Sequence, residues 1–399
     1  MEYSFSENAR ALKPSAIREI LKMSAAPGII PFSAGNPSPE AFPSREVAQI
    51  TQKLFAEDPI AALQYSVTEG YTPLRETLKA YMQQNHDSFK GFDDILITAG
   101  AQQVMSLAAA ALCGAGDTIL CEEPSFVGSI NALKLSGASL TGIPMQEDGL
   151  DLAALEEAAK TNKNVKLLYI IPNFQNPTGI TTSLKKRRAI YALAKKYGFL
   201  ILEDNPYGDL YFTEESLPSI KSMDTDGIVL YAGSFSKVLS PGLRVGFCIA
   251  PQPLIAKFTA IKQTQDVHSN ILAQMIAYHF MTDYDFAAHL KRLRALYKEK
   301  AALCRKKAEE CLMPEITCSR VTGGLFLWCA LPPQIDMQDF CTRAIREYRV
   351  AVVPGSAFLT DPQKPCQNFR VNYSTPTDEQ IISGMDALKL LKNAMLSGK

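Results

Sequence analysis

The stretch GSFSKVLSPGLRVGF, residues 233–247, places a single lysine among small, hydroxyl-bearing and apolar residues. Lys237 follows Ser234 and Ser236, and Arg244 is the next cation along the chain. Most lysines are solvated surface charges, but partial burial beside another cation lowers the pKa of a lysine. Such an amine can attack a carbonyl carbon and carry a proton. The stretch therefore predicts a catalytic lysine.

Further chemically useful side chains occur where other apolar runs end. Each run is short and rich in β-branched or large apolar residues, which is typical of strands. Together these side chains offer an anion-binding backbone turn, an aromatic face, an amide, a carboxylate and a phenol. They are Gly100, Ala101 and Gln102 after DILITA, Phe126 in EEPSF, Asn176 in PNFQNPTG, and Asp204 and Tyr207 in EDNPYGD.

The apolar runs alternate with helical patterns between about Asp93 and Ala250. This alternation predicts an α/β core, with a mostly parallel sheet between helices. The run RVGFCIA follows Lys237 too closely for a helical crossover, so we expect an antiparallel strand there. In a parallel sheet, ligands bind outside the carboxyl ends of the strands. The useful side chains should therefore line one crevice, and their inventory fits a phosphorylated, ring-shaped cofactor that bears an aldehyde.

The rest of the chain predicts a second, smaller unit. A charged helical pattern without proline or glycine begins near Asp283 and can connect the two parts. Strand and helix signals follow it, such as GGLFLWCAL and NFRVNYS, and indicate a smaller α+β domain. We predict a large domain at residues 50–285, a small domain at 286–399, and an N-terminal segment, 1–49, that packs with the small domain.

Composition excludes several classes of protein. The 399 residues suffice for two domains, and 41 basic against 41 acidic residues leave no positive excess for nucleic acid. The nine cysteines form no CxxC pair and the four histidines no ligand cluster, so neither a disulfide framework nor a metal site is indicated. No apolar run could span a membrane, and the N-terminus does not look like a signal peptide. We expect a soluble, thiol-reduced protein of the cytoplasm.

The lysine stretch and several other motifs resemble one enzyme family. SFSKVLSPGLRVGF is similar to the cofactor-lysine signature of the fold-type I, class I/II aminotransferases that depend on pyridoxal phosphate. LQYSVTEGY, PNFQNPTG, DNPYGDL, VVPGSAF and NFRVNYS occur in that family's order and approximate spacing. LKPSAIREIL and FSAGNPSPEAFP are most similar to the kynurenine and 2-aminoadipate aminotransferase subgroup. The resemblance implies a mostly parallel seven-stranded sheet in the large domain and pyridoxal 5'-phosphate as the cofactor.

The resemblance also implies roles for the residues around the cofactor ring. Lys237 would bind the cofactor's aldehyde and later move the substrate proton. Asp204 would pair with the protonated ring nitrogen, although by itself it could be a helix cap or a turn residue. Tyr207 and Asn176 would donate to the phenolic oxygen of the ring. Phe126 stands where the subgroup commonly has a stacking tyrosine, so it keeps the aromatic face without the hydroxyl.

For the cofactor's phosphate, the resemblance implies a set of donors that suits a dianion. This set comprises the backbone and side chains around Ala101 and Gln102, the hydroxyls of Ser234 and Ser236, and the guanidinium of Arg244. In addition, Tyr65 matches a tyrosine that reaches the phosphate of the neighbouring subunit. A homodimer, with Tyr65 contributed across the interface, is therefore expected.

Substrate recognition is implied by the same resemblance. Arg370 would bind the α-carboxylate as a bidentate pair, with Asn176 and the backbone near Gly35 completing the clamp. Closure of the small domain over the substrate would then exclude water. Arg18 matches an arginine of an N-terminal helix that can contact a distal carboxylate or carbonyl of the substrate. Arg18 can equally be a surface arginine paired with a nearby glutamate.

These roles predict an aminotransferase that moves an amino group from an L-amino acid to a 2-oxo acid, such as 2-oxoglutarate, in two half-reactions. The expected donors are 2-aminoadipate, glutamate, and aromatic or large aliphatic amino acids. One alternative is another pyridoxal-phosphate enzyme, a lyase or a decarboxylase, although a carboxylate clamp at Arg370 disfavours decarboxylation. The other is a MocR-like regulatory domain. Its DNA-binding module would need about 50 residues before the matching part, which begins near Phe32, so we expect no such module.

Overall fold

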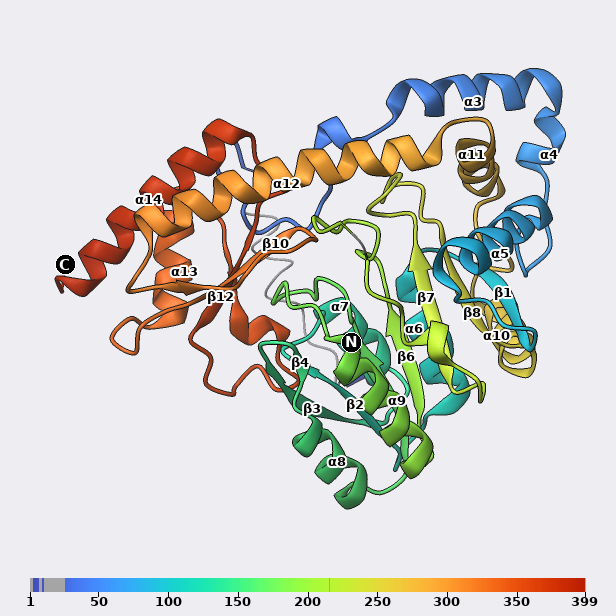
Figure 1. The fold of residues 1–399 in the computed structure, drawn as a ribbon, viewed down its shortest axis with the longest axis horizontal. Helices are drawn as coiled ribbons and strands as arrows, with labels where there is room; N and C mark the ends of the chain where they lie inside the picture. The colour runs from blue at the N-terminus through green and yellow to red at the C-terminus, as the bar shows by residue number, and fades with distance from the viewer. Residues whose placement is uncertain (1–2, 7–8, 11–25, 215, 399) are drawn as a thin grey trace.

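Two β-sheets, one large and one small, organise the computed structural model of the chain (Figure 1). The structure describes residues 3–6, 9–10, 26–214 and 216–398. The strands of the large sheet are β1 (Asp93–Thr98), β2 (Thr118–Glu123), β3 (Ser139–Gln146), β4 (Gly149–Leu150), β5 (Val165–Ile170), β6 (Leu200–Asp204), β7 (Val229–Ser234) and β8 (Gly246–Pro251). Their order is β1-β8-β7-β6-β5-β2-β3-β4.

Pairing in the large sheet is mostly parallel, as predicted. Strands β7, β6, β5, β2 and β3 pair in parallel, whereas β8 is antiparallel to both of its neighbours. The antiparallel strand predicted after Lys237 is therefore confirmed. The sheet has eight strands where seven were predicted, because the chain turns back after β3 into the two-residue strand β4. Only one residue of β3 is buried, so this edge strand lacks the continuous apolar run of the inner strands.

Helices cover both faces of the large sheet. Because side chains alternate along a strand, each face builds its own apolar core. One core joins Leu155 of α8 and Ile190 of α9 to Leu168 and Ile201, and the larger core includes α5, α6, α10 and α11. No helix in the described ranges is long and apolar enough to cross a membrane. The helices of this part of the chain are α3 (Ser44–Glu57), α4 (Pro59–Leu63), α5 (Thr72–His86), α6 (Ala101–Leu112), α7 (Val127–Lys134), α8 (Leu152–Thr161), α9 (Leu184–Tyr197), α10 (Gln252–Gln265) and α11 (Ile271–Thr282).

The small sheet is antiparallel and has its own core. Its strands, in the order β11-β12-β10-β9, are β9 (Thr317–Cys318), β10 (Phe326–Ala330), β11 (Val353–Pro354) and β12 (Asn368–Asn372). The register places Trp328 of β10 opposite Arg370 of β12. Helices α13 (Met337–Arg346) and α14 (Asp378–Leu396) pack on this sheet, and Phe32 of the N-terminal segment is buried in the same core.

Helix α12 (Phe286–Cys311) extends from the large-sheet part of the molecule to the small-sheet part (Figure 1). Its first half, with Leu290 and Tyr297, is buried in the core of the large sheet, and its second half, with Ala301 and Cys304, in the core of the small sheet. The Asp285 side chain caps the helix by accepting from the backbone N of Ala288 at 2.8 Å. We propose that the small domain begins at residue 286, with α12 as a connector shared by both cores.

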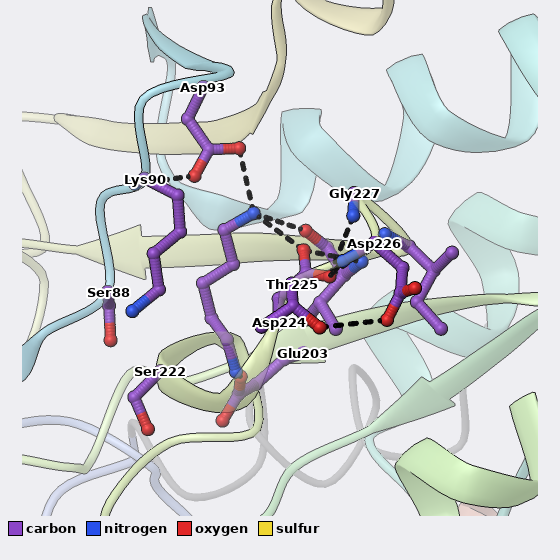
Figure 2. A network of polar contacts seen from close by, with 12 residues as sticks. Ser88, Lys90, Asp93, Glu203, Ser222, Asp224, Thr225, Asp226 and Gly227 are labelled. Atoms are coloured by element: carbon purple, nitrogen blue, oxygen red, sulfur yellow. Dashed lines mark hydrogen bonds and ion pairs between the residues drawn. The ribbon is translucent and has the colours of Figure 1, made fainter. Parts of the chain in front are cut away.

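A buried ion network fixes two strands that lead to the site (Figure 2). The ammonium of Lys221 donates to Asp93 at 2.8 Å, to Asp224 at 2.9 Å and to the carbonyl of Val229 at 3.0 Å. All three charged side chains are fully buried, so removing Lys221 would leave two carboxylates in the interior without their cation. Asp93 begins β1 and Val229 begins β7. The network therefore holds together the two strands that precede α6 and Lys237.

Candidate active site

The carboxyl end of β6 and the loop after β7 line a cavity of about 270 Å³. Most residues predicted for the site line this one cavity. The exceptions are Gly100 and Tyr65, which do not line it, and Arg18, which lies outside the described residues. The predicted residues that the cavity brings together are Gly35, Ala101, Gln102, Phe126, Asn176, Asp204, Tyr207, Ser234, Ser236, Lys237, Arg244 and Arg370.

Lys237 reaches the cavity from the loop between β7 and β8. Its Nζ donates to the backbone carbonyl of Gly35 at 2.7 Å. Desolvation, followed by the charges of Arg370 and Arg244, lowers the pKa of Lys237 to about 8. An amine with this pKa is partly neutral near neutral pH, so it can act as a nucleophile and as a proton carrier. Gly35 thus contacts the lysine through its carbonyl, and its place in the carboxylate clamp stays a prediction.

Asp204 ends strand β6 and is buried in the wall of the cavity. Its Oδ2 accepts a hydrogen bond of 2.8 Å from the hydroxyl of Tyr169, which lies 2.8 Å from the Ser129 hydroxyl. Its Oδ1 has no hydrogen-bond partner among the described residues. Burial raises the pKa of Asp204 to about 7, although the bond from Tyr169 opposes this shift. A buried carboxylate with one unpaired oxygen is suited to bind a cationic N–H group.

Tyr207, Asn176 and Arg370 form a chain of hydrogen bonds. The Asn176 amide donates to the Tyr207 hydroxyl at 3.4 Å and accepts from Nη1 of Arg370 at 2.7 Å. Burial raises the pKa of Tyr207, so the phenol keeps its proton and can donate to an oxygen anion. The chain links the small sheet, through Arg370, to the loops of the large sheet.

Arg370 is a buried cation that hydrogen-bonds only to neutral groups in the described part of the chain. In addition to Asn176, it donates through Nη2 to the carbonyl of Ser33 at 2.7 Å, while its Nε has no partner among the residues that the structure describes. Its guanidinium lies 4.4 Å from the ring centre of Phe326 and 5.1 Å from that of Phe358. Burial lowers the pKa of Arg370 to about 10. An uncompensated buried guanidinium is a binding site for a carboxylate, which fits its planar fork.

The N-terminus of α6 and the guanidinium of Arg244 contribute anion donors to the cavity wall. Helix α6 begins at Ala101, and the first N–H groups of a helix have no partner within it. Gly100, with φ of 80°, precedes the helix, and a Cβ at this position would collide with the Arg244 guanidinium. This glycine therefore allows Arg244 to lie against the helix start. Gln102 reaches across to the carbonyl of Gly128 at 3.5 Å.

Two hydroxyls and an aromatic ring complete the lining. Ser234 ends β7 and Ser236 follows it, and the Ser234 hydroxyl accepts from the backbone N of Ser236 at 3.1 Å. Phe126 precedes α7 and lines the cavity together with Val127 and Ser129 of that helix. The cavity thus combines anion donors, an aromatic face, an acidic side chain and an amine, which suits a flat, phosphorylated ring with an aldehyde.

Tyr65 lies apart from these residues. Its side chain is 81% exposed, and its ring makes an edge contact with His268 at 5.8 Å between ring centres. Tyr65 therefore adds nothing to the cavity of its own chain.

Sequence reasoning missed Tyr169, Ser129 and Ser33. Tyr169 lies inside the apolar run of β5, where a tyrosine is usually part of the core. Its position on the strand neighbouring β6 was the one available signal, because paired strands bring their side chains together. Ser33 acts through its carbonyl, for which a sequence contains no signal.

Comparisons with known proteins agree with this cavity. The family model described as aminotransferase class I and II matches residues 27–388. The chain is 36% identical to a 2-aminoadipate transaminase of Thermus thermophilus, over 96% of this chain and 95% of the relative, and 35% identical to an aromatic-amino-acid aminotransferase of Thermococcus litoralis, over 97% and 93%. The crystal structure of a Thermus thermophilus α-aminoadipate aminotransferase, complexed with phosphopyridoxyl-leucine, superimposes with a TM-score of 0.91 at 35% identity, covering 99% of this chain and 98% of that one.

The chain belongs to the class I and II aminotransferase family. It is an enzyme of the pyridoxal-phosphate-dependent aminotransferase type, and its substrates are amino acids and oxo acids. The predictions of family, fold type and cofactor are therefore confirmed. When bound, pyridoxal phosphate supplies an aldehyde that takes up an amine and a ring that accepts electrons.

Proposed function

We propose that this enzyme transfers the amino group of 2-aminoadipate, glutamate, or an aromatic or large aliphatic L-amino acid to a 2-oxo acid such as 2-oxoglutarate. The buried Arg370 guanidinium, which hydrogen-bonds only to neutral groups in the described chain, carries this proposal. A carboxylate held by Arg370 would lie in the same cavity as Lys237 and Asp204. The activities named for the two relatives support aromatic amino acids and 2-aminoadipate as donors. Arg18 is proposed to contact the distal carboxylate of an acidic donor.

Lys237 is proposed to bind the cofactor covalently through Nζ and, once a substrate amine has displaced it, to take the proton from the substrate Cα. The lowered pKa supports both tasks, because only the neutral amine can attack a carbonyl or accept a proton. The hydrogen bond to Gly35 would hold Nζ in place between these events. Protonated Lys237 would then return the proton to the cofactor side of the reacting bond.

Asp204 is proposed to hold a proton on the cofactor's ring nitrogen. Its unpaired Oδ1 can accept that N–H, while the bond from Tyr169 fixes the orientation of the carboxylate. Tyr207 would donate to the phenolic oxygen, with Asn176 keeping the hydroxyl in place. The phosphate would lie at the start of α6, where Ala101, Gln102 and Arg244, together with Ser234 and Ser236, offer donors. Phe126 would stack on the ring.

A panel of amino acids tests the proposed reaction. We expect 2-aminoadipate, glutamate, and aromatic and large aliphatic amino acids to convert the cofactor-loaded enzyme from its aldehyde form to its amine form, measured by absorbance in a single half-reaction. Subsequent addition of 2-oxoglutarate should restore the aldehyde form. D-amino acids are the control. If no member of the panel causes the change while one of them loses carbon dioxide or ammonia, the transferase proposal is wrong.

We also propose a homodimer in which Tyr65 donates to the phosphate in the partner's site. Ile60, Leu63 and Val67 of the same segment are exposed apolar side chains, as an interface requires. Losing one hydrogen bond to a charged group costs roughly 1.5–3 kcal/mol. Tyr65→Phe should therefore weaken cofactor binding by about 10- to 100-fold, measured by equilibrium dialysis, whereas the control Tyr71→Phe should not.

A subunit-mixing experiment separates contribution across the interface from a local effect. Mixed dimers of a Lys237→Ala chain and a Tyr65→Phe chain contain one site with Lys237 and the partner's intact tyrosine. We expect this site to bind the cofactor with the affinity of the unaltered enzyme. A monomer in sedimentation, or no recovery on mixing, would contradict the proposed interface.

A cytoplasmic location also remains a proposal from the sequence.

A further inference from the structure

Two cysteines on neighbouring strands of the small sheet face each other. Cys318 of β9 and Cys329 of β10 are paired residues, and their sulfur atoms lie 3.5 Å apart. The next pair toward the turn is hydrogen-bonded, because Ser319 donates to the Trp328 carbonyl. Since the two kinds of pair alternate, Cys318 and Cys329 form a non-hydrogen-bonded pair, in which side chains approach most closely.

This arrangement needs little movement to form a disulfide. Paired residues of this kind have Cα atoms about 4.5 Å apart, which lies within the range observed for disulfides, roughly 4.4–6.8 Å. The sulfur atoms need only approach from 3.5 Å to about 2.05 Å. Rotation of the two side chains can supply most of this approach.

The two thiols differ in the way that a disulfide exchange requires. Cys318 is partly exposed, whereas Cys329 is fully buried. Hydrogen bonding with Cys329 lowers the pKa of Cys318, and so does the charge of Arg305, which donates to the carbonyl of Ser319 at 2.8 Å. Burial raises the pKa of Cys329. The more acidic, accessible Cys318 is thus the attacking thiol, with Cys329 placed directly behind it.

We propose that Cys318 and Cys329 are a modification site, a dithiol that a low-molecular-weight disulfide converts to a reversible cross-strand disulfide. The Cys318 thiolate attacks one sulfur of the reagent, the reagent's S–S bond breaks, and one reagent thiol leaves with a proton. Cys329 then attacks the sulfur of Cys318, and the second reagent thiol leaves with the Cys329 proton. In total, the two cysteines lose two electrons and two protons, and the reagent is reduced to two thiols.

The disulfide would join β9 to β10. Strand β10 pairs with β12, and Trp328, the neighbour of Cys329, lies opposite Arg370, the residue proposed to bind the carboxylate. The proposal is independent of the amino donor and of the oligomeric state. Disulfides that form inside cells are usually transient or redox-sensing, which fits a pair of this kind.

Oxidation of the cofactor-loaded enzyme tests the proposal. The reagent is hydroxyethyl disulfide, which has no amino group and so cannot act as an amino donor. We expect intact-protein mass spectrometry to show the loss of two hydrogen atoms, and peptide mapping to show a Cys318–Cys329 cross-link that dithiothreitol reverses. The Cys304→Ser control, which removes a buried thiol of the same core, should behave like the unaltered enzyme.

Single replacements separate the two roles. Cys318→Ser should give no reaction at this site, and Cys329→Ser should stop at one hydroxyethyl-thio group on Cys318. Should Cys329→Ser fail to fold, the peptide map of the unaltered enzyme still decides. A stable adduct on Cys318 of that enzyme, a cross-link from Cys318 to Cys304, or two thiols that stay unmodified would each overturn the proposal.

Discussion

Lys237→Ala is expected to lower kcat for transamination by about 10⁴-fold or more. A positioned proton carrier alone contributes about 10²–10⁴-fold, and the variant also loses the covalent attachment of the cofactor. Lys237 is the one lysine among the described residues that line the cavity, so no neighbouring amine is placed to replace it. The measurement is kcat for the overall reaction under saturating amino acid and 2-oxo acid.

Borohydride reduction provides a second readout of the same residue. Reduction of the cofactor-loaded enzyme should fix the cofactor to the peptide that contains Lys237, and the alanine variant should release it on denaturation. Lys257→Ala, a change at an exposed lysine of α10, is the matched control and should keep the rate of the unaltered enzyme. Turnover of the Lys237→Ala enzyme at that same rate, or trapping on another lysine, would end the assignment.

Arg370→Lys is expected to reduce kcat/KM for amino acids by at least about 30-fold. Truncating one partner of a buried, hydrogen-bonded charge pair costs roughly 2–5 kcal/mol, and lysine cannot reproduce the planar fork of the guanidinium. The Phe326 and Phe358 rings pack against a flat group, which a lysine side chain does not supply. Most of the loss should be in KM if the contact is equally strong in the transition state.

A substrate without the carboxylate distinguishes lost recognition from general damage. The single half-reaction is compared for an amino acid and for the primary amine with the same side chain, in the unaltered and Arg370→Lys enzymes. We expect the variant to slow only the amino acid. Arg320→Lys, at an exposed arginine, is the control. An equal loss for both substrates would show that Arg370 acts through the fold of the cavity and not through the α-carboxylate.

The sequence predicted the core of the fold because strand ends are local features. Asp204 ends one buried strand and Lys237 follows another, and parallel strands bring their carboxyl ends to one edge of a sheet. The edge strands were less predictable. Strand β3 has one buried residue, and β4 has two residues, so neither shows the long buried apolar run by which strands are recognised.

The details of the site depend on contacts that no local pattern encodes. The N-terminal segment folds back so that the Ser33 carbonyl meets Arg370 and the Gly35 carbonyl meets Lys237. Any residue type can present a carbonyl, so the sequence could not distinguish these two positions. Tyr169 was missed for a related reason, because its hydroxyl becomes useful only when β5 pairs with β6 beside Asp204. The role proposed for Tyr65 depends on a second chain.

The placement of Trp328 gives the enzyme an internal optical reporter. The chain has one tryptophan, so all of its indole emission originates from strand β10. That indole packs edge-on against Phe358, and Phe358 in turn lies against the Arg370 guanidinium. Occupancy beside the guanidinium can therefore be followed by intrinsic fluorescence, without a dye and without turnover.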